Sequence, residues 1–448
     1  MEALAFVIGV VLMVVGLAVS IALHELGHLW PAKRFGVRVG QYMIGFGPTL
    51  WSRRIGETQY GVKAIPLGGY ISMAGMYPPS PALRQAQGPG QEAQGPGREA
   101  QGRSARNGRA GGGFFATMVQ DARDANDETL HGDADTRVFY RLPIWKRIVV
   151  MLGGPLMNLL FAIVLFAILF SGIGVQTAST TVASLSECVP ASSEAACAAS
   201  DPDAPAVDAG IQPGDRILSI DGQEVADFAE ATALIQASPG QSLTLLIERD
   251  GEEQTITVVP AAVAGGVVDA SSDDEVGFVG IRPAYQFVPQ PIWEGPRAAI
   301  ENVGAVAGII WQLPVRVWDT AVSLVTGQER DPNGPLSIVG AGRLSGEVAA
   351  AEAPILNRVS GFLSLLASLN IALFVFNMVP LLPLDGGHIA VALWEGIKRV
   401  WAKVFHRPPP KPVDATKLVP LTFVVVIALI AMGGVLILAD IFNPVSLF

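Results

Sequence analysis

The sequence is poor in charge. Only 16% of its 448 residues are charged and 50% are hydrophobic, whereas an ordinary soluble domain has roughly 25% charged residues. This composition argues against a single soluble globule. Four stretches lack Asp, Glu, Lys and Arg altogether: 3–23, 148–170, 361–384 and 418–439. Each is long enough to cross the hydrocarbon layer as a helix, because about 20 residues at about 1.5 Å per residue span roughly 30 Å.

The first apolar stretch lacks the marks of a cleaved signal peptide. Its start carries Glu2 instead of basic residues, and the apolar residues continue to Leu23 without a small-residue cleavage site. We therefore expect this stretch to be retained in the chain as a transmembrane helix.

Lysine and histidine are both absent from residues 175–360, a strongly acidic stretch that more than accounts for the net charge of −10. Lys and Arg are instead concentrated beside the apolar stretches, at 33–63, 137–147 and 398–417. By the positive-inside rule these basic flanks are cytoplasmic, so both termini and residues 175–360 are predicted to lie outside the cytoplasm. The basic flanks are explained by this orientation, and no nucleic-acid partner is expected.

The chain has only 2 cysteines, Cys188 and Cys197, and both fall in the stretch predicted to be extracytoplasmic. A cysteine nucleophile is disfavoured, because it needs a nearby base and residues 175–360 contain no histidine. An oxidising exterior permits a disulfide that closes a short loop between the two cysteines, and two free thiols are the alternative.

The predicted fold class is a multi-pass α-helical membrane protein with four transmembrane helices, cytoplasmic-face membrane-associated β-hairpins and one extracytoplasmic PDZ-like domain. The expected segments are a first transmembrane helix at 1–36, β-hairpins at 37–77, a low-complexity insert at 78–136, a second transmembrane helix at 137–174, the PDZ-like domain at 175–290, peripheral amphipathic helices at 291–360, a third transmembrane helix at 361–390, a cytoplasmic connector at 391–417 and a fourth transmembrane helix at 418–448.

The two cytoplasmic segments that follow the first apolar stretch differ in composition. Residues 37–73 alternate loosely in hydrophobicity, with GFGP at 45–48 and PLGGY at 66–70 as turn-like breaks, and this pattern favours hairpins at the membrane face. Within 78–136, seven-residue repeats rich in Gly, Pro, Gln and Ala cannot bury a core. We expect a disordered insert there, and a passive linker is favoured over a binding motif.

The stretch from 175 onward has the short strands and turns of a β-rich domain. GIQPGDRILSIDGQEV at 210–225 resembles the core of a PDZ domain, and residues 243–259 alternate around Asp250 and Gly251 as a hairpin does. From 291 to 327 the sequence is typical of a helix but contains Glu, Asp and Arg residues throughout. We expect an amphipathic helix on the outer leaflet there, in preference to a fifth span.

The sequence HELGH at the end of the first apolar stretch has the spacing of a zinc site. On a helix His24 and His28 share one face, so both imidazoles can reach one metal ion, and Glu25 lies where it can address a metal-bound water. The alternative is two chance histidines at a helix end. Ionisable residues contiguous with a membrane span are costly and tend to be functional, which favours the metal site.

Zinc catalysis requires a third protein ligand and an open coordination position. Asp385, in LDGGH at the end of the third apolar stretch, is the best candidate, because the first and third stretches both run from outside to inside and so end at similar depth. His388 is a weaker candidate ligand, and a polar residue at a helix start is its default interpretation. His131 and His406 are expected to be exposed.

These motifs together resemble those of the site-2 protease family of intramembrane zinc metalloproteases, in the bacterial branch of the regulator of sigma-E protease and its actinobacterial counterparts. The resemblance rests on HELGH, GFGP, PLGGY, GGPLMN, a single PDZ-like segment, NGPLSI and FNMVPLLPLDGG, in this order. It implies one zinc ion per chain, held by His24, His28 and Asp385, with Glu25 as the general base.

The resemblance also implies a substrate-binding residue in the third apolar stretch. In the family an Asn three residues before the first Pro of this motif contacts substrate, and Asn377 stands at that spacing before Pro380. An interhelical hydrogen bond is the alternative for Asn377. The spacing of Asn370 matches the pattern less clearly, and packing is the favoured interpretation there.

The implied function is regulated intramembrane proteolysis in the bacterial plasma membrane. The expected substrates are single-span membrane proteins of the anti-sigma factor class, cut near the cytoplasmic face after an upstream site-1-type protease has trimmed them outside. The PDZ-like domain would bind a substrate tail, exclude bulky partners or serve as a structural cap. The alternative function is a catalytically inactive PDZ-bearing membrane scaffold, against which the presence of Glu25 argues. A transporter is disfavoured, because inverted repeats are not found.

Overall fold

The computed structural model describes residues 2–76, 137–189, 197, 201–265, 274–408, 413 and 418–445. The chain divides into two compact units. The helical unit comprises Met1–Leu169 and Ile292–Phe448, and the sheet unit comprises Phe170–Pro291. The predicted low-complexity insert at 78–136, with His131, lies outside the described residues.

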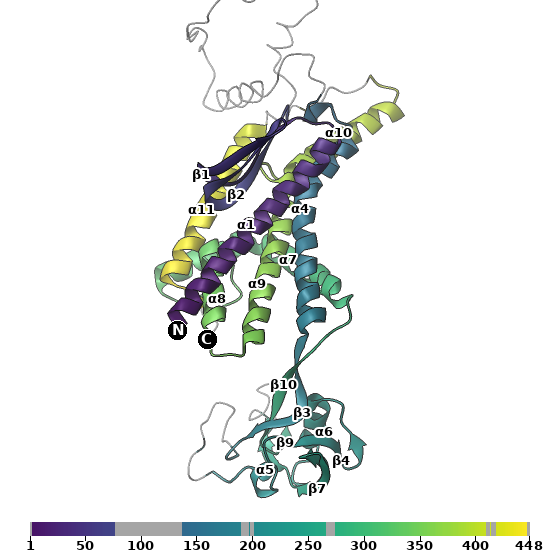
Figure 1. The fold of residues 1–448 in the computed structure, drawn as a ribbon, viewed down its shortest axis with the longest axis vertical. Coiled ribbons are helices and arrows are strands. Elements are labelled where there is room, and N and C mark those ends of the chain that lie inside the picture. The colour runs from purple at the N-terminus through teal and green to yellow at the C-terminus, as the bar shows by residue number, and fades with distance from the viewer. Residues whose placement is uncertain are drawn as a thin grey trace, which may run out of the picture. The chain divides into compact units, whose positions relative to one another are not determined.

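Among the described residues, 5 helices are long and apolar enough to cross a membrane. Four of them cover most of the apolar stretches that were predicted to span: α1 (Glu2–Arg34), α4 (Ile144–Ala167), α9 (Ile355–Asn377) and α11 (Val419–Phe442). A π-helical segment, Ile168–Ile173, continues α4. Figure 1 shows α4 and α9 running alongside α1.

The fifth long helix, α7 (Glu294–Thr326), is placed differently. A Cβ at Gly295 would lie 2.7 Å from the backbone of Ala167, at the C-terminal end of α4. Just beyond the other end of α7, the Gln328 carbonyl accepts a hydrogen bond from the Asn443 side chain after α11, at 2.9 Å. The neighbouring helices α4 and α11 both run from the cytoplasmic side outward in the predicted topology. In that topology both ends of α7 lie at the same end of the bundle, and its placement as a peripheral helix in preference to a fifth span stays a prediction.

Helices α1 and α4 cross at a contact made of glycines. A Cβ built on Gly27 would lie 2.2 Å from the carbonyl oxygen of Gly153, and a Cβ on Gly153 would lie 2.0 Å from the carbonyl oxygen of Gly27. Neither position can therefore carry a side chain without moving a backbone. Small residues let membrane helices approach closely, and here they bring the HELGH turn of α1 against the GGPLMN segment of α4.

Two long strands, β1 (Val39–Ile55) and β2 (Thr58–Met73), form the predicted hairpin region. The strands fold back on each other, so that Tyr42 of β1 is paired with both Ile71 and Tyr60 of β2. Positive φ angles of 91° at Gly45 and 108° at Gly68 mark the breaks in GFGP and PLGGY. Glycine adopts this left-handed conformation without the Cβ penalty of other residues.

The third apolar stretch is interrupted. Helix α9 ends at Asn377, seven residues before the expected end at Leu384, and a new helix, α10 (Asp385–Val404), follows a short turn segment. The apolar run continues through this break, but Pro380 and Pro383 lack the N–H that a continuing helix would need. The break places Asp385 at the first position of a helix rather than at the end of a span.

The carboxylate of Asp440 connects the start of α8 (Ile338–Ala350) to the end of α11. Asp440 pairs with Arg330 at 2.5 Å and accepts the backbone N–H groups of Ser337 and Gly340 at 2.7 and 3.1 Å. Ser337 itself caps α8 by accepting the N–H groups of Val339 and Gly340. The NGPLSI motif is thus anchored by a buried polar network.

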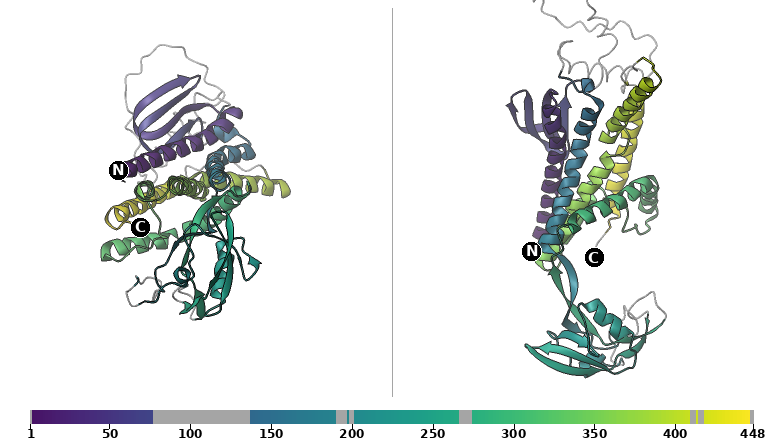
Figure 2. Two further views of the ribbon diagram at one scale, coloured as in Figure 1. Left: turned by 60° about the horizontal axis from the view of Figure 1, so that its bottom comes forward. Right: turned by 90° about the vertical axis from the view of Figure 1, so that its right-hand side faces the viewer.

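The sheet unit is built on an antiparallel sheet with the strand order β10-β3-β4-β6-β7, to which β5 is added beside β4. Its elements are β3 (Val175–Leu185), α5 (Pro205–Asp208), β4 (Arg216–Ile220), β5 (Gln223–Glu224), α6 (Phe228–Gln236), β6 (Leu243–Arg249), β7 (Glu252–Val258), β8 (Ala261–Ala264), β9 (Glu275–Phe278) and β10 (Ile281–Val288). β6 and β7 form the hairpin predicted around Asp250 and Gly251. Figure 2 shows the sheet with its short helices from two sides. The likeness of this unit to a PDZ domain stays a prediction.

The core of the sheet unit consists of alternate apolar residues of its strands, such as Ile217, Leu245 and Ile247, which are at most 1% exposed. Asp215, in the PGD turn before β4, is also buried. It accepts two hydrogen bonds from Arg249, both at 2.7 Å, and one from the Gln212 N–H at 2.8 Å. Burial alone would raise the pKa of Asp215, but these hydrogen bonds outweigh it and hold the pKa below its ordinary value.

Candidate metal centre

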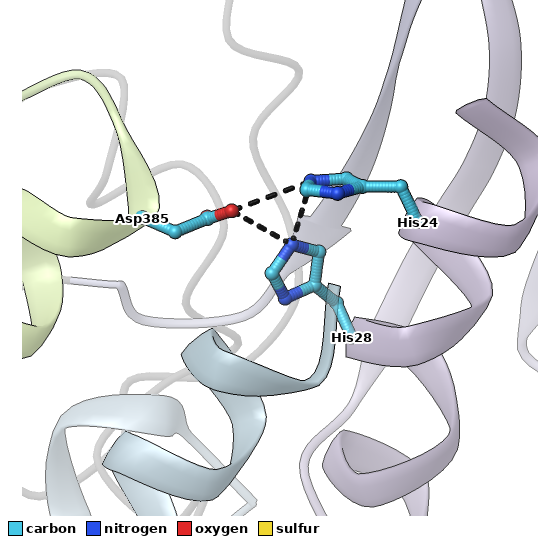
Figure 3. Close-up of side chains that lie close together, drawn as sticks. All are labelled: His24, His28 and Asp385. Carbon is cyan, nitrogen blue, oxygen red and sulfur yellow. Dashed lines mark hydrogen bonds and ion pairs between the residues drawn. The ribbon is translucent and has the colours of Figure 1, made fainter. Parts of the chain in front are cut away.

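The HELGH sequence lies on a regular turn of α1, so His24 and His28 project from the same helical face. Figure 3 shows both imidazoles pointing toward Asp385, which enters from the start of α10. The three side chains come from two helices that are far apart in the sequence. The structure thus brings together the three residues that were predicted as ligands.

The three candidate ligand atoms form a small triangle. Nε2 of His24 and Nε2 of His28 each lie 3.3 Å from Oδ2 of Asp385, and the two Nε2 atoms lie 3.2 Å apart. Bonds of about 2.0–2.1 Å to a tetrahedral zinc ion would separate its ligands by about 3.3 Å. The donor set of two imidazoles and one carboxylate, and its spacing, therefore fit zinc.

The carboxylate of Asp385 supports the same interpretation. Its Oδ2 atom is buried and has no hydrogen-bond partner among the described residues. A buried carboxylate oxygen without a partner is costly. A cation held between this oxygen and the two Nε2 atoms would satisfy all three at once, and among the described residues this is the group of His, Cys, Asp and Glu side chains that can hold a metal.

Both imidazoles are oriented from behind by α4. Nδ1 of His28 lies 2.8 Å from the carbonyl oxygen of Val150, and Nδ1 of His24 lies 3.2 Å from Oδ1 of Asn158. When Nε2 is to bind a metal, the proton is on Nδ1, and these two oxygens are its acceptors. Asn158 is only 1% exposed, so its amide is held inside the bundle next to the site.

The fit between α4 and His28 leaves no room for a side chain at Gly154. A Cβ there would lie 2.2 Å from Nε2 of His28, the candidate ligand atom itself. Glycine at this position is therefore required for the imidazole to reach Asp385. GGPLMN, which follows the basic flank of α4, builds one wall of the site.

Comparison with known proteins identifies relatives along nearly the whole chain. The profile of peptidase family M50 matches residues 12–407. The chain is 32% identical over 463 residues to the zinc metalloprotease Rip1 of Mycobacterium tuberculosis, with 99% of both chains covered. It is 32% identical over 460 residues to the protein of the same name from Mycolicibacterium smegmatis, again with 99% coverage of both. The metalloprotease MmpA of Caulobacter vibrioides is 27% identical over 412 residues, 88% of each chain.

The chain belongs to peptidase family M50. This membership confirms the prediction from the motifs, namely a zinc metalloprotease of the site-2 protease family. The match includes both HELGH and LDGGH, so the two segments that meet in the candidate metal centre both lie within the family region.

In this M50 chain Glu25 lies beside the metal centre and against the β-sheet. It is 7% exposed, and a Cβ on Gly69 of β2 would lie 2.9 Å from its side chain. Nearby, the Tyr42 hydroxyl donates to the Ala22 carbonyl at 2.8 Å. Burial raises the pKa of Tyr42 to about 12, with further contributions from the charges of Glu25 and Tyr60, so this hydroxyl stays protonated. PLGGY therefore covers the turn of α1 that carries the predicted base.

The other candidate residues are not part of the group of three ligand atoms. Asn377 and Asn370 each donate to a carbonyl four residues earlier in α9, at 3.0 and 2.8 Å, and Asn370 is fully buried. His388 follows Asp385 in the first turn of α10 and is not in the group of candidate ligand atoms. His406 is exposed, as expected.

The cysteines of the sheet unit are joined in a disulfide, Cys188–Cys197. Of the two alternatives considered for them, the structure contains the bond. It closes a loop that belongs to the sheet unit and takes no part in the metal centre.

Asn158 is the site residue that the sequence analysis missed as a functional group. Its segment, GGPLMN, entered the sequence analysis only as one of the motifs that carry the family resemblance. The available signal was its place in GGPLMN, as a lone amide in an otherwise apolar span. A buried amide in a membrane helix seeks a hydrogen-bond partner, but the sequence could not show that the partner is His24.

Proposed function

We propose that this chain is an intramembrane zinc endopeptidase in which His24, His28 and Asp385 hold the metal and Glu25 is the general base. The single observation that carries the proposal is the triangle of Nε2, Nε2 and Oδ2 atoms with sides of 3.2–3.3 Å. These atoms come from HELGH and LDGGH, and their separation equals that of ligands around one tetrahedral ion.

Zinc, when bound here, supplies a Lewis acid that polarises a peptide carbonyl and lowers the pKa of water to about 7. The chain's own residues do the rest. Asn158 and the Val150 carbonyl hold the two imidazoles in the ligand tautomer. The Glu25 carboxylate takes the proton of the attacking water as the new C–O bond forms, and returns it to the amine nitrogen as the C–N bond breaks.

The substrate class follows from the depth of the site and from the resemblance. His24 stands where the first apolar stretch ends, so a peptide bond that reaches it lies near the cytoplasmic membrane face. We assign single-span membrane proteins of the anti-sigma factor class as substrates, trimmed outside by a site-1-type protease. The enzyme would lie in the bacterial plasma membrane with both termini and the sheet unit outside the cytoplasm, and the sheet unit would act as a size filter.

A transmembrane substrate must unwind before it is cut, because a helix hides its amides in hydrogen bonds. The unwound backbone needs partners. β2 lies against Glu25 at Gly69, which supports pairing of an extended substrate with this sheet. Asn377, at the last residue of α9, is the proposed side-chain partner. Asn370 has weaker support, because it is fully buried within the bundle.

Replacement of Glu25 by Gln tests the function. Glu25→Gln removes the base but none of the three ligands, so the purified full-length variant should retain about one zinc per chain while cleavage of a membrane-embedded single-span reporter falls by about 10²-fold or more. Zinc is measured by elemental analysis and cleavage in proteoliposomes. The matched control is Glu2→Gln, the same change on the same helix at an exposed position, which should leave both unchanged. Undiminished cleavage by Glu25→Gln would contradict the assignment of Glu25 as the general base and favour another base.

A further inference from the structure

Helix α10 leads from the metal centre to the start of α4. At its start Asp385 lies against His28, which is held by the Val150 carbonyl of α4. Further along, a Cβ built on Gly396 would lie 3.6 Å from Ile144, the first residue of α4. From Gly396 to Val404 the helix extends about 12 Å further along its axis. The second half of α10 therefore starts at the level where α4 begins.

The side of α10 that packs on α4 carries a buried ion pair. Glu395 is paired with Arg147 of α4 at 2.8 Å, and the exposed fractions of these side chains are 2% and 10%. The other carboxylate oxygen of Glu395 accepts from Arg399 at 2.5 Å, one turn further along α10. The helix is thus attached to the bundle through a buried ion pair.

The opposite side of α10 is apolar, and no other part of the described residues covers it. Seven large apolar side chains between Leu393 and Phe405 are each exposed by half or more. They are Leu393, Trp394, Ile397, Val400, Trp401, Val404 and Phe405. A helix on a water-soluble surface has the reverse arrangement, with its apolar stripe on the core and its charges outside. The arrangement in α10 suits an apolar surrounding on its outward side.

Charged residues show that this surrounding is a membrane interface and not the centre of the bilayer. Lys398 lies over the ring of Trp394 at 5.7 Å, and Lys403 and Arg407 follow at the exposed end of the helix. The start of α4 repeats the combination, with Lys146 over the ring of Trp145 at 5.5 Å. Aromatic rings with cations beside them are typical of the headgroup region, where the rings bury their apolar part and the cations reach lipid phosphates.

We propose that α10 is an interfacial helix whose outward face is inserted in the cytoplasmic leaflet, with Lys398, Lys403 and Arg407 bound to the phosphates of anionic phospholipids. Cations on a surface helix complement the negative charge of that leaflet. Residues 391–405, predicted as part of a cytoplasmic connector, become a membrane-bound element under this proposal. It does not depend on the proposed function, because it concerns the surface of α10 from Leu393 onward and not the chemistry at Asp385.

Spin labels on the full-length chain in vesicles of phosphatidylcholine and phosphatidylglycerol test the insertion. The native cysteines are bonded to each other, so a nitroxide label attaches only to an introduced thiol. A label at Val400→Cys should be more accessible to oxygen, which concentrates in lipid, than to a water-soluble nickel chelate. A label at Lys403→Cys should show the reverse. If both labels favour nickel, the helix is in water, and if Val400→Cys excludes both reagents, protein covers this face; either result overturns the proposal.

Lipid retention in native mass spectrometry tests the headgroup assignment. The full-length chain should retain phosphatidylglycerol in preference to phosphatidylcholine. Changing Lys398, Lys403 and Arg407 to Gln should reduce that preference by about fivefold per charge. Lys398→Arg, Lys403→Arg and Arg407→Lys together preserve the charges and should preserve the preference. The control Arg53→Gln with Arg54→Gln removes exposed cations from β1. An unchanged preference in the Gln variant, or an equal loss in the control, overturns the assignment.

Discussion

Each unit of this chain buries an aspartate, and the two are treated in opposite ways. In the sheet unit Asp215 has two hydrogen bonds from Arg249 and one from a backbone N–H. In the helical unit the buried Oδ2 of Asp385 has no hydrogen-bond partner among the described residues and faces two imidazole nitrogens at 3.3 Å. The carboxylate of Asp215 has its hydrogen-bond partners within the protein. The Oδ2 atom of Asp385 would gain a partner from a bound cation.

This difference matches the roles proposed for the two residues, a stabilising one for Asp215 and a metal-binding one for Asp385. In the sequence the two residues look alike, because each is an Asp beside Gly in a turn-like motif: Asp215 in PGD and Asp385 in LDGG. The structure distinguishes them by the partners that surround each carboxylate. A fully satisfied buried carboxylate contributes to folding, whereas an unsatisfied one stores a cost that ligand binding relieves. Four predictions follow from this contrast.

Loss of the Asp385 carboxylate is expected to have the largest effect. Asp385→Asn removes the one anionic atom of the triangle, so zinc should be lost on dialysis and cleavage should fall by about 10³-fold or more. Elemental analysis and a reporter cleavage assay measure the two losses. The calorimetric transition of the sheet unit should not move, because Asp215 and Arg249 are untouched. Full zinc content in Asp385→Asn would contradict the ligand assignment.

Loss of the Asp215 carboxylate should have the complementary effect. Asp215→Asn leaves Arg249 without its anion, which is expected to destabilise the sheet unit by about 3 kcal/mol and lower its transition by roughly 10 °C or more in calorimetry of the full-length chain. Zinc content should stay unchanged. The control is Asp208→Asn, at an exposed position of the same unit, and an equal shift in that variant would refute a special role for Asp215.

Removal of the amide behind His24 should give an intermediate loss. Asn158→Ala deletes the acceptor of the Nδ1 proton, and loss of such a partner typically weakens metal binding by about 10- to 100-fold. Competition with a chelator measures the zinc affinity. Asn158→Asp keeps a carboxyl oxygen at this position and should recover part of the affinity. Equal affinities for Asn158→Ala and the unmodified chain would show that Val150 and the helix packing suffice.

The smallest effect is expected from acid. Because the folded-state pKa of Asp215 is lowered, its contribution to sheet-unit stability is complete above the unfolded-state pKa of about 3.9 and is lost as the pH falls through the folded-state value. Calorimetry between pH 7 and pH 3 should therefore show this loss only at the acid end. In Asp215→Asn the loss of stability at the acid end should be absent. If the stability of both chains falls equally at low pH, Asp215 is not its source.

Much of the helical unit could be predicted from the sequence, because apolar runs, basic flanks and HELGH are local patterns. Depth along the spans was enough to select Asp385 as the partner of His24 and His28. The end of α9 was misplaced, since hydropathy continues through the prolines after Asn377 while the helix does not. Proline breaks the hydrogen-bond ladder without making the segment polar.

Other features depend on which helical faces meet, and a single sequence does not contain that information. Asn158 acts on His24 across the Gly27 and Gly153 contact, between residues that are more than a hundred positions apart. The attachment of α10 through Glu395 and Arg147 likewise joins distant segments. The sequence showed basic and aromatic residues in α10, but only the packing showed that the apolar face is the one left uncovered.

The order in which the ligands leave the ribosome has a consequence for the cell. His24 and His28 are among the first residues synthesised, and Asp385 follows only after the whole sheet unit. Since chains fold from the N-terminus during synthesis, the two imidazoles are in place long before the carboxylate that joins them. No nascent or prematurely ended chain that lacks Asp385 contains the full ligand set. Under the proposed ligand assignment, an incomplete chain is therefore expected to be unable to cleave the membrane proteins around it.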